Sequence, residues 1–572
     1  MEYKEIIIEK KRNFVSPDFV VKDWGLLEPY YNDLLNRKIN NLSQLEKLIF
    51  DMSELDAVLS EDAGWRYIRM TCDTTNEKLV ADYTYFTNEI APKIAPLANE
   101  LNKKITSCEF VSSLNQGQFF IYLRSMRNSL ELFREENIPL QTEIKNLEQQ
   151  YGAIAGAQTI FHDAKELTLP QASVYLKSQD RALREAIYRK VQDRRAQDEN
   201  SLNDLFSRLI SLRHQVALNA GFKNFRDYMH RELGRFDYSV EDCFAFHEAV
   251  KKHIVPVARQ LETERKEKLK LSEYRPWDTE VDEEGREPLR PVANAEDLTL
   301  KTQLCFQALS PFFGNCIAFM KKIGHLDLDS RKGKAPGGYN YPLYETGVPF
   351  IFMNSAGLHR DMVTMVHEGG HALHSILTRD LPLTESKNVP SEVAELASMG
   401  MELLSMEKWE AFFQSPEELR RARQEQLQKI IKTLPWIASI DKFQHWIYTN
   451  PDHSVEERYA CWVSIMKEFG TGVVDYSGLE MNLQRSWQVQ LHLFEVPFYY
   501  IEYGFAQLGA IALWRNYKQN SENAITKYVD FLKLGYTTSI PAIYETADIK
   551  FDFSDAYIGE LSEFILEQYR KA

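Results

Sequence analysis

Apolar and polar residues alternate along most of the chain with the three- and four-residue spacing of amphipathic α-helices. In residues 45–52 (LEKLIFDM), for example, apolar side chains recur at that spacing between charged ones. Proline is sparse in residues 14–150, so long helices are predicted there, and the helical spacing resumes from about 175 to 270. The pattern therefore predicts a mainly α-helical protein.

Two interruptions of this pattern suggest where the chain divides. Residues 152–157 (GAIAGA) and 167–170 (LTLP) predict short extended segments or a small hairpin. Glycines and prolines gather again in 331–349, and an apolar strand is predicted directly after them at 350–354 (FIFMN). We expect an N-terminal helical region at 1–150, a second helical region with short extended segments at 151–330, and the chemically active region at 331–572.

Composition excludes several classes of protein. The 572 residues include 68 basic and 83 acidic side chains, and the net charge of −15 gives phosphate backbones no general attraction. No stretch approaches the ~20 apolar residues that a membrane span requires. The six cysteines lie far apart without a CxxC pair, which is typical of reduced thiols in the cytoplasm. We therefore expect a cytoplasmic protein that binds neither nucleic acid nor membranes.

Candidate chemistry is concentrated in residues 366–375 (VHEGGHALHS). His367 and His371 are four residues apart on a predicted helix, so they share one face and can bind one zinc ion. Glu368 lies about 100° round the helix, where its carboxylate can face a water on the metal's open side. A surface helix with incidental histidines is the alternative. The apolar flanks and the two adjacent glycines in mid-helix argue against it, because a local rule broken in a buried helix suggests a close approach.

A catalytic zinc site needs a third protein ligand, and residues 390–402 (PSEVAELASMGME) offer three glutamates on one helical face. A solvated acidic stripe is the alternative. Glu395 is the best candidate, because the 24 residues after His371 allow one helix to end and a second to return antiparallel. Glu402 then fits a hydrogen bond to the ring of a ligand histidine, and Glu392 competes for either role.

The HEGGH motif, the downstream segment 395–402 and the strand at 350–354 together resemble the thimet oligopeptidase and oligoendopeptidase F family of zinc metallopeptidases, most closely its oligoendopeptidase F and Pz-peptidase branch. The resemblance is strongest over about 330–515. It implies a large helical zincin-type fold, with a small sheet beside the HExxH helix and a deep central channel. It also implies one Zn²⁺ ion held by His367, His371 and Glu395, with Glu368 as the general base.

Hydrolysis of a peptide also needs a donor for the developing oxyanion, and residues 492–504 (HLFEVPFYYIEYG) are the proposed source. The family resembled here carries a histidine and tyrosines at similar positions, which implies a role for His492, Tyr500 and Tyr503. Tyr499 competes with the other two tyrosines, and simple core packing is the alternative for all of them. His374 could line the site, although packing within the helix is the favoured interpretation.

These observations predict a zinc-dependent endo-oligopeptidase that hydrolyses short unstructured peptides through a Glu-activated, zinc-bound water. The strand at 350–354 could pair with an extended peptide if it lies at a sheet edge. A metallocarboxypeptidase or dipeptidyl carboxypeptidase of the same zincin type is the alternative, and would need a clamp for the terminal carboxylate. A non-catalytic peptide-binding protein with structural zinc is a third possibility, which would leave Glu368 without a role.

Overall fold

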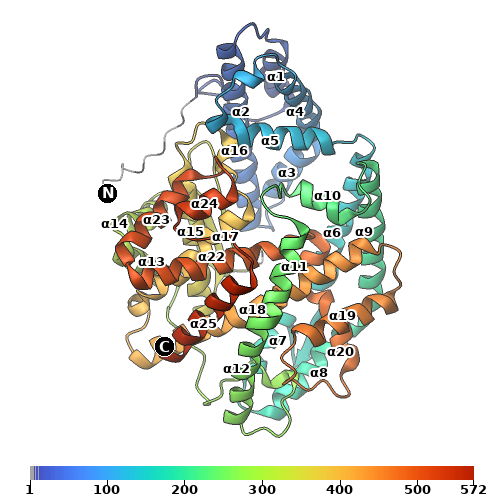
Figure 1. Ribbon diagram of the computed structural model, residues 1–572, viewed down its shortest axis with the longest axis vertical. Helices are drawn as coiled ribbons and strands as arrows, with labels where there is room; N and C mark the ends of the chain where they lie inside the picture. Colours follow the sequence, from blue (N-terminus) through green and yellow to red (C-terminus); the bar gives the residue numbers. More distant parts are fainter. Residues whose placement is uncertain (1–5, 7, 9, 11, 336) are drawn as a thin grey trace. The chain divides into compact units, whose positions relative to one another are not determined.

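The computed structural model describes residues 6, 8, 10, 12–335 and 337–572 and shows a mainly helical protein with two small sheets (Figure 1). Pro336, within the predicted break at 331–349, lies outside the described residues. The chain forms two compact units, each built from three stretches of sequence. The first unit comprises residues up to 131, 289–423 and 506–551, and the second comprises 132–288, 424–505 and 552–572.

The first unit begins with long helices, as the spacing predicts. Helix α2 starts where the Asn41 side chain accepts the backbone N–H of Gln44, a typical N-cap. The helices of this unit are α1 (Trp24–Asn36), α2 (Leu42–Cys72), α3 (Glu77–Tyr85), α4 (Ala91–Thr106), α13 (Ala295–Leu309), α14 (Pro311–Lys322), α15 (His359–Thr378), α16 (Thr384–Lys387), α17 (Ser391–Met406), α23 (Ser521–Leu534) and α24 (Ile540–Thr546). Helices α5 (Gln116–Leu132), α18 (Pro416–Thr449) and α22 (Tyr500–Gln519) contribute residues to both units.

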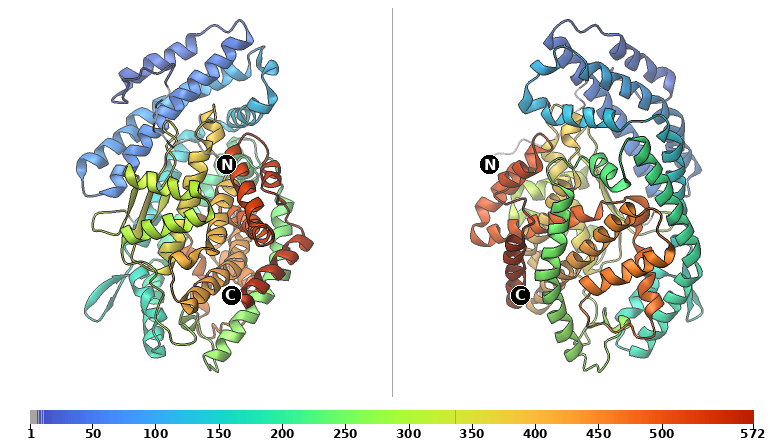
Figure 2. Two further views of the ribbon diagram at one scale, coloured as in Figure 1. Left: turned by 90° about the vertical axis from the view of Figure 1, so that its left-hand side faces the viewer. Right: turned by 45° about the vertical axis from the view of Figure 1, so that its right-hand side comes forward.

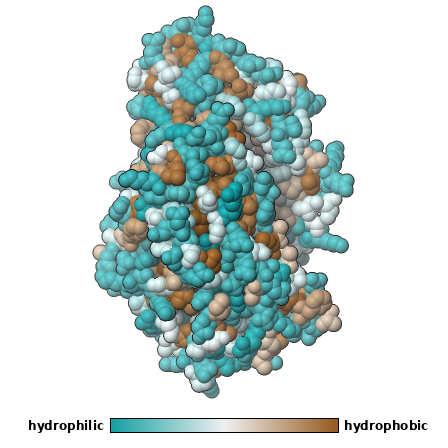
Figure 3. Space-filling view, turned by 90° about the vertical axis from the view of Figure 1, so that its right-hand side faces the viewer, coloured by the Kyte–Doolittle hydropathy of each residue, from teal (hydrophilic) through white to brown (hydrophobic). Residues whose placement is uncertain are grey.

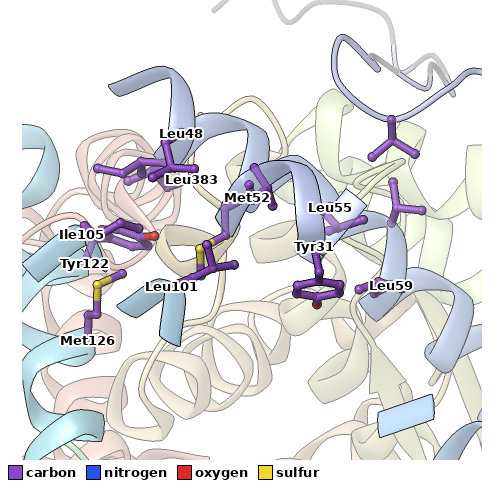
Figure 4. Close-up of a cluster of buried hydrophobic side chains, with 14 of the residues drawn as sticks. Tyr31, Leu48, Met52, Leu55, Leu59, Leu101, Ile105, Tyr122, Met126 and Leu383 are labelled. Carbon is purple, nitrogen blue, oxygen red and sulfur yellow. The ribbon is translucent and has the colours of Figure 1, made fainter. Parts of the chain in front are cut away.

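The N-terminal helices of this unit bury one continuous apolar cluster between them (Figure 4). Leu48, Leu55 and Leu101 are fully buried in it, and Tyr122 packs against them from α5. Leu383 joins the same cluster although it lies far along the chain, just after α15. Burial of apolar side chains therefore fixes the segment that follows the HExxH helix onto the N-terminal helices.

A three-stranded sheet precedes the HExxH helix in the first unit. It consists of β3 (Leu326–Asp329), β4 (Tyr339–Tyr341) and β5 (Phe350–Ser355), in the order β3-β5-β4. Strand β5 pairs in parallel with β3 and antiparallel with β4. The strand predicted at 350–354 is therefore confirmed, but it is the central strand. The apolar side chains of β5 are buried, as expected for a strand with neighbours on both sides.

Three residues separate β5 from helix α15, and the side chain of Asp361 caps the N-terminus of this helix. Its Oδ2 accepts the backbone N–H groups of Ala356 at 2.7 Å and Leu358 at 3.0 Å. Helices α15 and α17 pack against each other, and the sheet contacts α15 through β4 and β5. The prediction of a mainly helical fold with a small sheet beside the HExxH helix is thus confirmed.

The second unit is also mainly helical (Figure 2). Ile160 of its hairpin belongs to a buried cluster with Ile187 and Val191 of α8. The hairpin β1 (Thr159–His162) and β2 (Lys165–Thr168) forms between the two predicted extended segments and overlaps them only at 167–168. Residues 152–156 differ from that prediction, because they complete helix α6. The helices are α6 (Asn137–Gly156), α7 (Leu169–Ser173), α8 (Arg181–Gln197), α9 (Glu199–Asn219), α10 (Phe225–Glu232), α11 (Val240–Ala249), α12 (Val255–Lys268), α19 (Val455–Phe469), α20 (Glu480–Gln484), α21 (Leu491–Glu495) and α25 (Asp555–Lys571).

The surface in Figure 3 is mainly hydrophilic, with hydrophobic side chains scattered among polar ones. Scattered apolar side chains of this kind are normal on the surface of a globular protein. Among the described helices, none combines the length and the apolar character needed to cross a bilayer.

Candidate metal centre

The predicted metal ligands converge from two packed helices of the first unit. His367 and His371 are one turn apart on α15, and Glu395 is on α17. One ligand atom from each of the three lies within 4.8 Å of the other two. Oε2 of Glu395 is 3.4 Å from Nε2 of His367 and 3.9 Å from Nε2 of His371. Two ligands of one tetrahedral zinc lie about 3.2–3.8 Å apart, so these three side chains fit a single ion.

Two glycines allow the neighbouring elements to approach α15 closely. A Cβ on Gly370 would lie 2.7 Å from the backbone O of Ala397 and 2.7 Å from Cα of Ser398, both on α17. A Cβ on Gly369 would lie 2.6 Å from the ring of Phe306 on α13. Glycine is the residue that permits such close approach. The two mid-helix glycines are therefore explained by packing, as the sequence suggests.

Hydrogen bonds orient two of the three predicted ligands. Nδ1 of His367 donates to Oε1 of Glu402 at 2.6 Å, which leaves Nε2 on the side of Glu395. The Ser398 hydroxyl lies 3.1 Å from Oε2 of Glu395 and donates to it. Glu392 is buried on the same helix but is not among the three converging residues. Of the roles that the sequence leaves open, the structure therefore places Glu395 with the histidines and Glu402 behind His367.

The pKa values of these groups depend on burial and on one another. Burial raises the pKa of Glu368 to about 7, although the positive charge of His367 and a hydrogen bond from the backbone of Asn340 oppose the increase. Burial lowers the pKa of His367, but the hydrogen bond to Glu402 and the charges of Glu395 and Glu402 outweigh it and raise the value to about 9. Burial holds the pKa of His371 well below its usual value. Glu368 thus has the pKa of a group that can exchange protons near neutrality.

His374 has a structural environment. It is 4% exposed, its ring lies 6.3 Å from that of Phe531, and burial lowers its pKa to about 4. It is not among the converging residues. The environment of His374 is therefore that of a packed residue, which is the interpretation favoured from the sequence.

His492, Tyr499, Tyr500 and Tyr503 form a cluster of their own in the second unit. The His492 ring lies 4.8 Å from that of Tyr500 and 6.0 Å from that of Tyr503, and the two tyrosine rings are 5.5 Å apart. Tyr499 lies 5.3 Å from Tyr503 and 6.1 Å from His492. The structure therefore brings these four predicted residues together, in a different unit from the metal ligands.

Sequence reasoning missed two groups that support these clusters. Gln490 interacts with Nδ1 of His492 at 2.7 Å, accepts the indole N–H of Trp436 at 2.9 Å, and hydrogen-bonds Tyr500. The backbone N–H of Asn340, on β4, is bonded to Glu368. Gln490 lies only two residues before His492, and this closeness in the sequence is a signal that could have identified it as a supporting residue. A backbone group 28 residues before Glu368 carries no such mark in the sequence.

Fold and site together define a mainly helical protein with a candidate two-histidine, one-glutamate metal centre. The chain belongs to peptidase family M3: the model of that family matches residues 174–563, and the model of the peptidase M3 N-terminal domain matches residues 14–133. The predicted resemblance is therefore confirmed.

Two curated relatives and two solved structures agree with this assignment. The chain is 26% identical over 215 residues to oligopeptidase PepF of Bacillus subtilis (strain 168), covering 37% of this chain and 31% of that relative. It is 24% identical over 218 residues to an oligoendopeptidase F homolog of Borreliella burgdorferi, covering 37% of this chain and 36% of the relative. These matches span about a third of each relative's length.

The structural likeness extends over nearly the whole chain. A structure of Pz peptidase A with an inhibitor matches with a TM-score of 0.89 and 25% identity, over 98% of this chain and 99% of that one. Oligoendopeptidase-F from Enterococcus faecium has the same general fold, with a TM-score of 0.63 and 15% identity over 96% of this chain and 98% of that one.

Proposed function

We propose that the protein is a cytoplasmic zinc-dependent endo-oligopeptidase that hydrolyses short unstructured peptides. The observation that carries the proposal is the convergence of His367, His371 and Glu395, with the buried Glu368 next to His367 on the same helix. Membership of a peptidase family and the likeness to Pz peptidase A support it. The cysteines of the described residues form no disulfide bonds with one another, which is consistent with the cytoplasm.

The side chains present suit metal-assisted amide hydrolysis. Two imidazoles and one carboxylate are a donor set that suits zinc, which when bound lowers the pKa of a water towards ~7 and polarises a carbonyl. Glu368 acts as the general base that accepts the proton of this water and then transfers it to the leaving amine. Burial raises the pKa of this carboxyl, which favours its protonated form after it has accepted the proton.

The cluster of the second unit is the proposed source of the oxyanion donor. A phenolic O–H of Tyr500 or Tyr503 can donate to a developing oxyanion, and His492 has its pKa lowered to about 4 by burial, so it is neutral near pH 7. A neutral imidazole can donate one hydrogen bond from its protonated nitrogen. Gln490 holds His492 and Tyr500 in place, which is the support that a positioned donor needs.

The sheet suggests how an extended peptide would bind. Because β5 is the central strand, it is not the edge that the sequence interpretation requires, and β4 is an edge strand among the described residues. Asn340 in β4 hydrogen-bonds Glu368, so this strand lies beside the proposed base. A peptide that adds to β4 would be held by its backbone, largely independent of its side chains.

Hydrolysis of a quenched fluorescent peptide tests the proposal. We expect activity that a chelator abolishes and zinc restores, and we expect Glu368→Gln to lower kcat by about 10²–10⁴-fold while the protein still binds zinc. Glu395→Gln should lose zinc, whereas the matched variant Glu392→Gln on the same helix should retain both zinc and activity. Full activity of Glu368→Gln would refute the assigned base.

The same assay separates the alternative activities. An endopeptidase should cut peptides blocked at both ends, and mass spectrometry of the products should show internal cleavage. A carboxypeptidase or dipeptidyl carboxypeptidase would require a free C-terminal carboxylate and would release one or two residues. Metal-dependent peptide binding without any turnover would instead indicate a peptide-binding protein.

A further inference from the structure

A second group of side chains of the types that bind metals lies in the second unit, far from the HExxH motif in the sequence. Helix α11 carries Cys243 and His247, and helix α18 carries Asp441 and His445 (Figure 1). Each pair is four residues apart, so both members of a pair project from the same face of their helix. The four side chains meet: Nε2 of His247 donates to Oδ2 of Asp441 at 2.8 Å, and Nε2 of His445 is 3.1 Å from the same oxygen.

The geometry of three of these residues is that of a ligand set. Sγ of Cys243, a carboxylate oxygen of Asp441 and a ring nitrogen of His445 all lie within 4.8 Å of one another. Nε2 of His445 lies 3.1 Å from Oδ2 of Asp441, which is close to the separation of two ligands on one ion, so a bound ion would replace the direct contact between these two atoms.

Two polar atoms of this group have no partner among the described residues. They are Nδ1 of His445 and Oδ1 of Asp441, and the two residues are 5% and 0% exposed. Buried polar groups are normally hydrogen-bonded, and a buried charge is costly unless it is paired or bound to a metal. The set therefore has donor atoms that the protein itself does not satisfy.

Aromatic side chains pack against this group. The ring of Phe244 lies 4.8 Å from that of His445, the ring of Phe498 lies 5.3 Å from it, and Phe469 lies 6.5 Å from His247. The hydrogen bond from His247 holds the carboxylate of Asp441 in place between the two helices, so that its second oxygen is available to a ligand.

We propose that Cys243, Asp441 and His445 form a second metal site that binds a zinc ion and links helices α11 and α18. The thiolate and imidazole favour zinc over magnesium or calcium, which prefer oxygen ligands. His247 is a positioning residue, because its N–H fixes the carboxylate of Asp441. Binding would release the thiol proton of Cys243, which now lies 3.5 Å from the backbone O of Ser239.

The two proposed sites differ in exposure, which suggests different roles. The side chains of His367 and His371 are 20% and 19% exposed, whereas those of His445 and Asp441 are 6% and 0% exposed. The lower exposure of His445 and Asp441 favours a structural role for this site, because a substrate could not reach an ion held there. Helix α11 continues directly into a π-helical turn, η4 (Val250–Ile254), a distortion that often marks functional positions. The site is independent of the proposed peptidase activity.

Metal content of the full-length protein tests the proposal. After the protein is saturated with zinc and desalted, elemental analysis by mass spectrometry should give two zinc ions per chain. The double variant His367→Ala/His371→Ala should retain one ion, because the buried site is untouched. One ion in the wild type and none in the double variant would overturn the proposal, and this comparison leaves the new site unmutated.

Cobalt substitution identifies the thiolate ligand directly. A cobalt ion bound by Cys243 should give a thiolate-to-metal charge-transfer band in the near ultraviolet, which His367, His371 and Glu395 cannot produce. The band should persist in His367→Ala/His371→Ala and in the matched variant Cys461→Ser on α19, and disappear in Cys243→Ser. A cobalt-saturated wild type without the band, or a band that survives Cys243→Ser, would overturn the assignment.

Discussion

Side chains that do not belong to the converging triad determine how its ligands are oriented. Glu402 accepts from Nδ1 of His367, so the ring can present only Nε2 to an ion shared with Glu395. Glu402 is itself buried, which keeps its carboxylate from competing bonds with water. A hydrogen-bond acceptor on the ring nitrogen that does not face the metal fixes the tautomer and the direction of a histidine ligand. We therefore expect Glu402 to affect metal affinity although it is not one of the three ligands.

Replacement of Glu402 by glutamine should weaken zinc binding by about 10–100-fold. The amide retains the shape of the side chain but lacks the charge that favours the imidazole N–H. Competition with a chromophoric chelator measures the affinity. The matched variant Glu410→Gln, which removes an exposed carboxylate paired with Arg423, should leave the affinity unchanged. Equal affinities of Glu402→Gln and the wild type would contradict the role assigned to this hydrogen bond.

The carboxyl group of Asp56, also in the first unit, makes the free energy of unfolding depend on pH. Burial and the nearby Glu385 raise the pKa of Asp56, in α2, to about 7. Its ordinary value is about 3.9, so between pH 4 and 7 the unfolded chain ionises while the folded chain stays protonated. The folded state then binds more protons, and the contribution of Asp56 to stability falls as pH rises from about 4 to 7.

The variant Asp56→Asn should remove this loss, because an amide does not ionise. We expect it to be more stable than the wild type at pH 8 by about 1–3 kcal/mol, with little difference at pH 4. Urea unfolding at both pH values measures the change. Asp18→Asn, at an exposed position, serves as the control and should differ from the wild type at neither pH. A stability difference that does not vary with pH would contradict the argument.

The residues of the site differ in how well the sequence predicts them. His367, Glu368 and His371 are predictable, because one helical turn relates them and the chemistry is local. Glu395 requires a second helix to return, and Glu392 on the same helix is not among the three converging residues. The N–H of Asn340 belongs to a strand whose pairing is settled by distant residues, so no local pattern marks it.

At the scale of elements, close helix packing is what brings the ligands together. The missing side chain of Gly370 lets α15 approach the backbone of α17 at Ala397, two residues from Glu395. Tyr528 of α23 reinforces α17 at the same point, because its hydroxyl donates to the backbone O of Ala397 at 2.6 Å. The separation of the two ligand-bearing helices therefore depends on one glycine.

Gly370→Ala should push α17 away from α15. The added Cβ would lie 2.7 Å from backbone atoms, which cannot move as a flexible side chain does, so we expect a loss of about 1–3 kcal/mol and weaker zinc binding. Gly156→Ala is the matched control, because a Cβ there meets nothing within 4 Å, and it should be neutral or slightly stabilising. Thermal unfolding and zinc titration measure both. A Gly370→Ala protein with normal zinc affinity would contradict this account.

The elements also show where periodicity is an insufficient guide. The apolar run at 350–354 identifies β5 correctly, but a run that is buried on both sides has no feature that distinguishes a central strand from an edge one. Residues 152–156 contain two glycines and still complete α6, because the alanines between them favour a helix and a helix already formed is easily extended by a few residues. Where the second glycine leads into β1, the predicted hairpin does form.

At the scale of the whole molecule, each compact unit is assembled from three separate stretches of chain. The N-terminal cluster includes Leu383, and the sheet beside α15 includes β3, which lies before the glycine- and proline-rich break at 331–349. Composition along the chain marks the break but does not reveal that the strands on its two sides pair. Long-range pairing is the part of the fold that the sequence alone does not predict.

A fragment of residues 331–572 contains the three proposed metal ligands and Glu368, but it lacks β3, the parallel partner of β5, and α13, whose Phe306 packs on Gly369. It also loses α14, and with these elements the apolar faces that cover α15. We expect the fragment to aggregate or to show reduced helicity by circular dichroism, and to retain no zinc after desalting, because metal ligands must be positioned by folding. The full chain under the same conditions is the control. A soluble fragment of native helicity that holds one zinc ion would show that the sheet and α13 are dispensable for the site.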